Sequence, residues 1–293
     1  MNTFALSLVL ASTVLHAGWN LLMRRRKSET AAFMFRMTLI TVAVGLVPAV
    51  ASEACARSIP LAAWGYVAAS GVCCGLYTFF LVMGYEAGDF TVVYPVARAL
   101  PVVLVGLWDG LRGHAPSAPG WAGMALVMAG CVLVPHVSWR GISLRPYLNR
   151  ATVYMVLTAL GTVGYSTLDK VAQEIVEPGF WTAVRYGYFF FLGNFVVFAA
   201  LWRLFHPRSR EKIRIGWLLP FAGAVMGYAA YALILWTYQI VGRASYVVAF
   251  RQFSIVIGVV VAFAVFREKG RSVRLTAALL ITAGLLCIGL WGA

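Results

Sequence analysis

Two arginines stand inside apolar segments at matching places in the two halves of this 293-residue chain. Arg98 lies in the apolar segment 91–111, and Arg251 lies in the apolar segment 244–266. A guanidinium inside a membrane is unfavourable unless it faces protein or water, so such residues are candidates for a functional site. Its fork of N–H donors suits a carboxylate or phosphate. We therefore expect Arg98 and Arg251 to bind an anionic group. The alternatives are that they reach the interface or pair with an acidic neighbour.

A polar and aromatic cluster in the first apolar segment adds to this candidate site. His16 and Asn20 lie four residues apart and share a helix face, with Trp19 beside them. A similar cluster, Tyr165 and Ser166, occupies the corresponding place in the second half. These residues could line a substrate cavity or form hydrogen bonds between helices. His16 could also exchange a proton near neutral pH.

Three tyrosines lie near the middle of apolar segments. Tyr77, Tyr165 and Tyr231 are too deep for the interfacial belts that Tyr and Trp often form. We expect their rings to pack against an aromatic or bulky apolar part of the substrate.

Prolines flank the first of the two arginines. Pro95 and Pro101 remove backbone donors, and such sites in transport proteins mark binding sites or bends. The segment of Arg251 has no proline and only Gly258, so a less marked bend is expected there. Arg36 and Arg185, near the ends of two other segments, could line the cavity or reach the interface.

The composition is that of a membrane protein. Hydrophobic residues make up 61% of the chain and charged residues 12%, about half the charged share of a soluble domain. About 20 apolar residues cross a bilayer as a helix. Ten segments meet this condition: 3–22, 31–51, 62–84, 91–111, 119–137, 150–169, 180–204, 215–240, 244–266 and 273–291. The predicted fold class is all-α integral membrane, with no soluble domain.

The basic residues indicate an orientation. Loops after odd-numbered spans carry sixteen Lys and Arg, whereas loops after even-numbered spans carry four. Positive loops stay in the cytoplasm, so both termini are predicted outside it. The net charge of +14 is thus explained by topology and lipid contacts, and nucleic-acid binding is not expected.

The two halves of the chain resemble each other from end to end. We divide it into a five-helix repeat at 1–137, a linker at 138–149 and a second five-helix repeat at 150–293. An odd number of spans per repeat inverts the second copy, and inverted repeats suit alternating access around a central site. Gly71 and Gly75, with Gly223 and Gly227 in the other half, predict close helix packing.

The five-plus-five arrangement, the cluster 18–20, the prolines of the fourth span and the segment 266–268 resemble the EamA-like family of the drug/metabolite transporter superfamily. The resemblance implies export of metabolites, with YddG-type exporters of aromatic and other amino acids as the most similar kind. It also implies cytoplasmic termini, which the loop charges contradict.

Motifs of hydrolases, metal enzymes and nucleotide-binding proteins are not found, so no enzyme activity, cofactor or metal is expected. Asp109 and Asp169 are expected near span ends, which favours facilitative transport over proton coupling. The sequence thus predicts a monomeric multi-pass exporter of large neutral amino acids in a bacterial-type inner membrane. The alternatives are an exporter of anionic or phosphorylated metabolites and a non-transport membrane protein. Outward-moving cationic drugs are disfavoured by the arginines.

Overall fold

The protein is an all-helical bundle. The computed structural model describes residues 2–24, 29–87, 90–134, 136, 138–139, 149–205, 215–266 and 271–292, and this part of the chain contains helices and no strand. The helices are α1 (Thr3–Arg24), α2 (Thr30–Ala56), α3 (Leu61–Ala87), α4 (Phe90–Leu111), α5 (Ala118–Leu133), α6 (Arg150–Ile175), α7 (Phe180–Phe205), α8 (Leu218–Ile240), α9 (Ala244–Phe250), α10 (Phe253–Phe266) and α11 (Arg271–Trp291).

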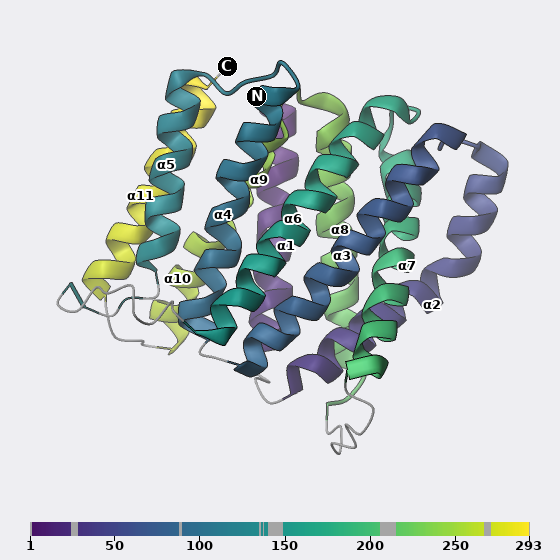
Figure 1. Cartoon of the computed structure of the whole chain (residues 1–293), viewed down its shortest axis with the longest axis horizontal. Helices are drawn as coiled ribbons and strands as arrows, with labels where there is room; N and C mark the ends of the chain where they lie inside the picture. Colours follow the sequence, from purple (N-terminus) through teal and green to yellow (C-terminus); the bar gives the residue numbers. More distant parts are fainter. Residues whose placement is uncertain are drawn as a thin grey trace.

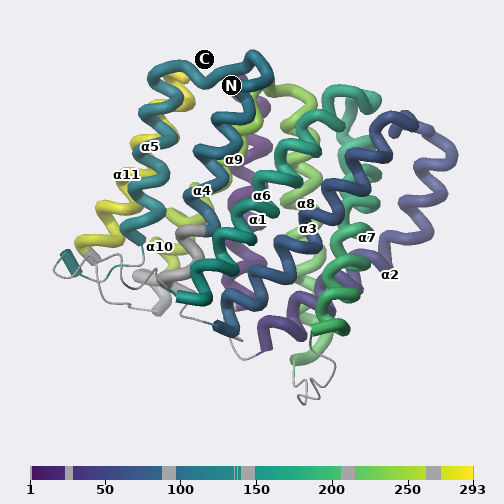
Figure 2. Tube along the Cα trace, in the orientation of Figure 1, coloured from purple at the N-terminus to yellow at the C-terminus, as the bar shows by residue number. Residues whose placement is uncertain are grey.

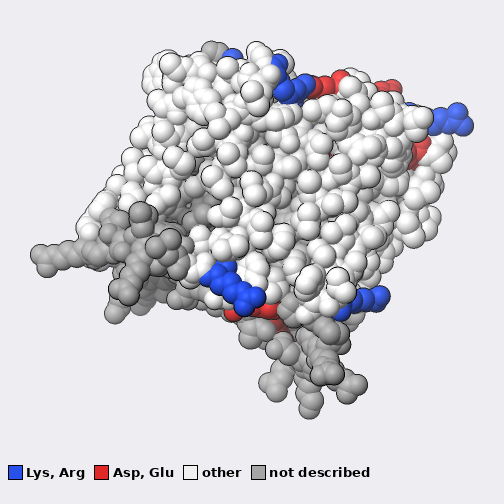
Figure 3. All heavy atoms as spheres, viewed as in Figure 1, with Lys and Arg blue, Asp and Glu red and all other residues white. Residues whose placement is uncertain are grey.

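The surface of the bundle matches a lipid environment. Among the described residues, eight helical segments are long and apolar enough to cross a membrane, and α5 is a shorter apolar helix. Large apolar side chains point outward, such as Val47 and Leu61. On the face shown in Figure 3, Lys, Arg, Asp and Glu gather at the two ends and leave an uncharged band between them. The chain is therefore a multi-pass membrane protein.

The two halves of the chain pack on each other reciprocally. Helix α3 packs on α6 and α7, while α8 packs on α1 and α2 (Figure 1). Helices α5 and α11 pair at one edge of the bundle, and α2 lies at the other edge. The trace in Figure 2 shows both chain ends at the same end of the bundle. Exchange of the halves thus maps one set of neighbours onto the other.

Glycines let several of these helices approach closely. A Cβ atom on Gly71 would lie 2.9 Å from the Cα of Gly193, so α3 and α7 touch backbone to backbone. A Cβ atom on Gly123 would lie 2.6 Å from the carbonyl oxygen of Gly284, between α5 and α11. The close packing predicted from the glycine of the third span is confirmed, since any larger residue would separate the helices.

The sixth span is longer than the sequence predicted. Helix α6 continues to Ile175, beyond the expected end at 169, and it buries Asp169 and Lys170 completely or nearly so. The Lys170 ammonium donates to the carbonyl oxygen of Tyr238 at 2.9 Å and lies 3.0 Å from Glu174. Arg112 pairs with the same carboxylate at 2.6 Å. Mutual pairing lets these charges continue the helix, which an apolar-run criterion could not anticipate.

Candidate functional site

The ninth span is broken where Arg251 lies. Helix α9 ends at Phe250, α10 begins at Phe253, and residues 251–252 form a turn between them. The amide of Gln252 donates to the carbonyl of Ala249 at 2.9 Å, and the amide of Ile255 donates to the carbonyl of Gln252 at 2.8 Å. These three-residue spacings are tighter than those of an α-helix. Interrupted helices inside a membrane occur where the backbone is buried in protein or lines a cavity.

Arg251 is buried at this break without a carboxylate partner. Its side chain is 5% exposed, and Nη2 donates to the Tyr165 hydroxyl at 3.4 Å. The guanidinium carbon lies 5.9 Å from the ring centre of Tyr165 and 5.7 Å from that of Tyr231. Nε and Nη1 are buried and have no hydrogen-bond acceptor. In the described part of the chain, this cation therefore contacts aromatic rings and one hydroxyl, and two of its donor nitrogens have no acceptor.

Arg98 connects the first half of the chain to the same break. Its Nη2 donates to the Arg251 carbonyl oxygen at 3.2 Å and makes a short hydrogen bond to the Ser254 hydroxyl. That hydroxyl also donates to the Arg251 carbonyl at 2.8 Å. An interrupted helix leaves backbone carbonyls without their usual amide donors. The Arg251 carbonyl accepts from the amide of Ser254, three residues further on, at 3.3 Å, and Arg98 of α4 supplies it with a further donor.

A small cavity lies between the halves at this point. Its volume is about 20 Å³, enough for roughly one water molecule. The lining comes from α3, α4, α6 and the broken ninth span, and it includes Tyr77, Leu81, Ala97, Arg98, Pro101, Thr158, Thr162, Tyr165, Val248, Arg251 and Gln252. The cavity is too small for a metabolite.

The structure brings together four of the nine residues that the sequence suggested for substrate binding. Tyr77, Arg98, Tyr165 and Arg251 all line the cavity. Tyr77 and Tyr165 meet edge to face with ring centres 5.7 Å apart, which makes an aromatic wall beside Arg251. Tyr231 lies behind this wall, its ring centre 5.7 Å from that of Tyr165.

The other suggested residues lie outside the cavity lining. The Trp19 indole donates to Nδ1 of His16 at 3.0 Å, and the Asn20 amide donates to the His16 carbonyl at 2.7 Å. His16 is nevertheless within electrostatic reach of Arg98 and Arg251, and its Nε2 is buried without a partner. Ser166 is fully buried. His16, Trp19 and Asn20 are thus hydrogen-bonded among themselves, and His16 lies near Arg98 and Arg251.

The helix break replaces the conformational sites that the sequence suggested. Helix α4 runs unbroken from Phe90 to Leu111 with Pro101 inside it. Pro95 lies within α4 as well, but its side chain is outside the described residues. Gly258 lies inside α10, not at an interruption. The interruption of the ninth span thus lies at residues 251–252 and not at Gly258, in a segment that contains no proline.

A buried carboxylate lies behind the tyrosines. Asp169 is 0% exposed and accepts hydrogen bonds from the Tyr186 hydroxyl at 2.8 Å and from the Tyr231 hydroxyl. Arg251 lies within its electrostatic reach. The sequence placed Asp169 at the end of a span, which was wrong because α6 extends further. The hydrogen bonds that join this aspartate to tyrosines of two other helices cannot be recognised without the fold.

A second carboxylate fixes the start of the broken span. Asp109, 1% exposed near the end of α4, accepts from the amides of Ala244 at 3.2 Å and Ser245 at 2.8 Å. These amides are the first of α9, which have no partners within the helix. Asp109 therefore caps α9, and Arg98 holds its other end, so α4 clamps the short helix at both ends.

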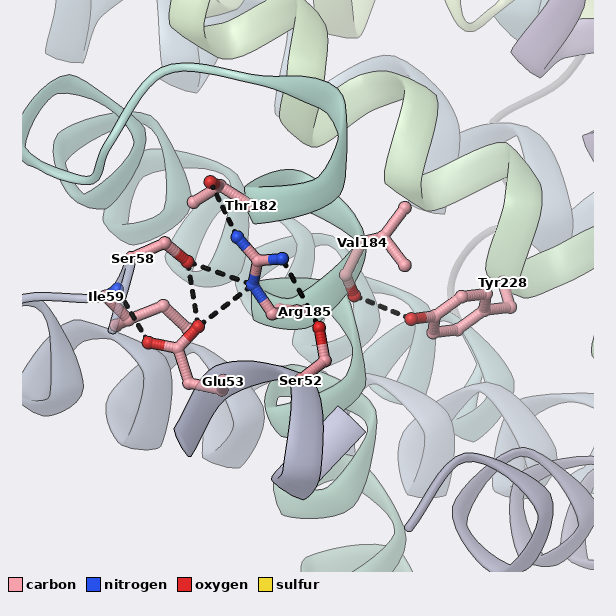
Figure 4. A network of polar contacts seen from close by, with 8 residues as sticks. All are labelled: Ser52, Glu53, Ser58, Ile59, Thr182, Val184, Arg185 and Tyr228. Atoms are coloured by element: carbon pink, nitrogen blue, oxygen red, sulfur yellow. Dashed lines mark hydrogen bonds and ion pairs between the residues drawn. The ribbon is translucent and has the colours of Figure 1, made fainter. Parts of the chain in front are cut away.

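Arg185 is the centre of a hydrogen-bonded cluster between α2 and α7, and its surroundings contrast with those of Arg251. Nε of Arg185 donates to Glu53 and to Ser58, each at 3.0 Å, and the remaining guanidinium nitrogens approach Ser52 and Thr182 (Figure 4). Glu53 also accepts from the amide of Ile59 at 2.8 Å. A cavity of about 440 Å³, mostly apolar, lies beside this cluster between α2, α7 and α8.

Arg36, in the first half of the chain, is likewise held by contacts within the protein. It makes a short hydrogen bond to the carbonyl of Ile215 and lies 4.6 Å from the ring centre of Trp217. Neither Arg36 nor Arg185 lines the small central cavity. Both arginines join residues of the two halves elsewhere in the bundle, so Arg98 and Arg251 are distinguished as the pair that lines the central cavity.

Comparison with known proteins supports the fold and does not assign a family. No protein-family model matches the chain, and no curated protein matches it. One solved structure, described only as a crystal structure of a protein, has a TM-score of 0.72 at 17% sequence identity and covers 100% of this chain and 99% of that chain. At this identity the similarity concerns the fold alone, and it extends over nearly the whole of both chains.

Proposed function

We propose that the protein is an amino-acid transporter, an exporter of aromatic and other large neutral amino acids that works by alternating access. One observation carries the proposal: Arg251, buried at a helix break between the two halves, has two donor nitrogens without acceptors. A carboxylate is a complementary ligand for them, since a guanidinium binds it through paired hydrogen bonds. The EamA-like resemblance of the sequence supports the same function, and outward direction rests on that resemblance.

The aromatic wall supports a large substrate side chain. Tyr77 and Tyr165 line the cavity next to Arg251, and Phe190 stacks on Tyr231 behind them with ring centres 4.6 Å apart. Rings arranged this way offer edges and faces to an aromatic side chain. Opening of the closed cavity would expose this wall together with the guanidinium, and so present both parts of an amino acid with partners.

The reciprocal packing of the halves supports alternating access. If α3 and α8 exchange roles, as the predicted repeat implies, the bundle can open toward either membrane face around one fixed site. In the closed state, contacts at the end that carries the termini join α4, α6 and α8 through Arg112, Glu174 and Lys170. We propose that these contacts separate when the site opens at that end, in a monomeric carrier of a bacterial-type inner membrane.

A second candidate is transport of anionic or phosphorylated metabolites. Two guanidiniums at the cavity, with no carboxylate among its lining residues, favour a cargo that carries net negative charge. Both candidates use the same arginines and the same mechanism, and they differ in whether the cargo has an ammonium group. Facilitative flux is proposed for either, since the buried Asp169 has its oxygens hydrogen-bonded to tyrosines.

Flux into liposomes tests the proposal. Reconstituted protein would be given radiolabelled phenylalanine, tryptophan, methionine, threonine, a sugar phosphate or a lipophilic cation, with and without a pH gradient. We expect saturable amino-acid flux that needs no gradient. Flux that is unchanged in the double variant Arg98→Ala/Arg251→Ala would contradict the carboxylate role. Flux of the sugar phosphate alone would replace the proposed cargo by the second candidate, and no saturable flux of any solute would overturn transport.

A further inference from the structure

Gln252 follows Arg251 in the turn and was not distinguished by the sequence. Its side chain is 3% exposed and lines the same cavity as Arg251. The side-chain Nε2 donates to the carbonyl oxygen of Val248 at 2.9 Å. Because a carbonyl can only accept, the nitrogen must face Val248, and the orientation of the amide is thereby fixed. The carbonyl oxygen Oε1 is consequently turned away from that helix backbone.

Oε1 of Gln252 is a buried acceptor without a donor. It has no hydrogen-bond partner, as Nε and Nη1 of the adjacent Arg251 have no acceptor. Buried polar atoms are normally paired, so three unpaired atoms on consecutive residues of one cavity need an explanation. Donors and an acceptor on adjacent residues of one cavity lining, which do not satisfy each other, are complementary to a molecule that carries both kinds of group.

An α-amino acid has these two groups next to each other. Its carboxylate would accept from Arg251, and its ammonium would donate to Oε1 of Gln252. We infer that Gln252 is the ammonium acceptor and makes the site select α-amino acids over carboxylates that lack the amine. This inference rests on the proposed function. Gln252 thereby decides between the two candidate cargoes, which the arginines alone cannot do.

A neutral acceptor suits this position better than a carboxylate would. A glutamate beside Arg251 would form an ion pair with the guanidinium and occupy the donors that the substrate needs. The amide oxygen accepts from an ammonium but competes weakly for Arg251. The rings of Tyr77 and Tyr165 can add cation–π attraction for the ammonium at the same cavity.

Paired substrates test the inference. Phenylalanine and 3-phenylpropionate differ by the amine, and their flux would be compared in liposomes with wild-type protein, Gln252→Met and Gln252→Glu. Methionine has a similar length and no acceptor oxygen. We expect wild type to prefer phenylalanine, and Gln252→Met to raise the phenylalanine KM about tenfold to a hundredfold while leaving phenylpropionate within about twofold. Gln252→Glu should weaken both substrates, since the new carboxylate pairs with Arg251.

Gln239→Met serves as the matched control. Gln239 accepts from the amide of Gly179 and donates to Gln173, away from the cavity. This variant should keep the preference for phenylalanine, whatever its stability. If a Gln252 variant does not fold, competition in wild type replaces it: unlabelled phenylalanine should inhibit labelled phenylalanine flux far better than phenylpropionate or phenethylamine.

Each outcome bears on a different claim. Wild-type protein that moves phenylalanine and phenylpropionate equally well would overturn the role of Gln252, and so would an unchanged preference in Gln252→Met. Loss of preference in both Gln252→Met and Gln239→Met would likewise overturn it. Absence of saturable flux of either compound in wild type would instead contradict the proposed function itself.

Discussion

Arg185, which is partly buried with a side chain 13% exposed, and Arg251, which is buried, lie in one half of the chain, and their surroundings differ completely. Arg185 has a carboxylate at 3.0 Å and three hydroxyl groups around it. Arg251 has one hydroxyl, two aromatic rings and two donor nitrogens without acceptors. Arg185 keeps some exposure to solvent and is compensated by partners within the protein, whereas Arg251 is buried and lacks such compensation.

The difference teaches how to separate a structural charge from a ligand-binding one. A buried cation whose partners belong to the chain stabilises the fold, and its loss leaves the partner carboxylate uncompensated. A buried cation with unmet donors lowers stability, and such sites are retained where a ligand completes them. Arg185 therefore belongs to the contact between α2 and α7, and Arg251 is the residue that we propose binds the substrate.

Neutralising each arginine in turn is the most direct test of whether the two differ in function. Arg251→Gln should reduce phenylalanine flux by about a hundredfold or more, since it removes the buried donor for the substrate carboxylate. Arg185→Gln, measured per folded molecule in the same liposomes, should retain most of the flux. Equal losses in the two variants would show that burial of an arginine, not its unmet donors, identifies the transport site.

Stability should respond in the opposite sense. Glu53→Gln and Arg185→Gln should each lower the free energy of unfolding by about 3 kcal/mol, because each leaves one buried charge unpaired. The double variant should be less destabilised than the two losses added together. Thermal unfolding in detergent measures these changes, with Arg251→Gln as the control that should not be destabilised. A strongly destabilised Arg251→Gln protein would indicate that Arg251 is structural as well.

A carboxylate that lies near Arg251 without contacting it allows a further test of the difference between the two arginines. Asp169 is separated from the guanidinium by Tyr231, whereas Glu53 touches Arg185 directly. Asp169→Asn keeps an acceptor for one tyrosine and removes the negative charge near Arg251. Substrate carboxylate should then bind about twofold to tenfold more tightly, as expected for a charge interaction across a few ångströms of protein. An increased KM would show that Asp169 assists the substrate instead of competing with it.

A smaller effect is expected where α4 clamps the start of α9. Asp109→Ala removes the acceptor for the first amides of that helix, and loss of such a cap lowers stability by about 1 kcal/mol. The unfolding midpoint of the purified protein would report it. The comparison variant is Ser117→Ala, which removes the hydroxyl that caps α5 and keeps the backbone amide that donates to Tyr246 of α9. Only Asp109→Ala should also lower flux, because only α9 leads to Arg251.

The smallest effect is predicted for Gly258→Ala. No atom lies within 4 Å of the position that a Cβ would occupy, and Gly258 is inside the continuous helix α10. Flux should stay within about twofold of wild type, since alanine favours the helix by about 1 kcal/mol without a clash. A loss of flux would mean that α10 bends at Gly258 during transport, in addition to the break at residues 251–252.

Much of the fold followed from composition. Long apolar segments must become helices in a bilayer, because no water is present to satisfy their backbone groups. This reasoning located the membrane helices within a few residues and failed for α6, where paired charges extend the helix past the apolar run. It also located Arg98, Arg251, Tyr77 and Tyr165, since charge and aromatic rings deep in apolar segments are unusual and can be recognised in one dimension.

The sequence by itself determined that this is a multi-pass helical membrane protein with two arginines inside it. The tertiary structure decided which arginine has a carboxylate, that the ninth span breaks at residues 251–252, and that Gln252, which has an unpaired oxygen, lines the cavity. The residues around the break have no local feature that forbids a helix. Asp109 of α4 contacts the start of α9 and Arg98 of α4 contacts its end, and contacts between segments so distant in sequence arise only after folding.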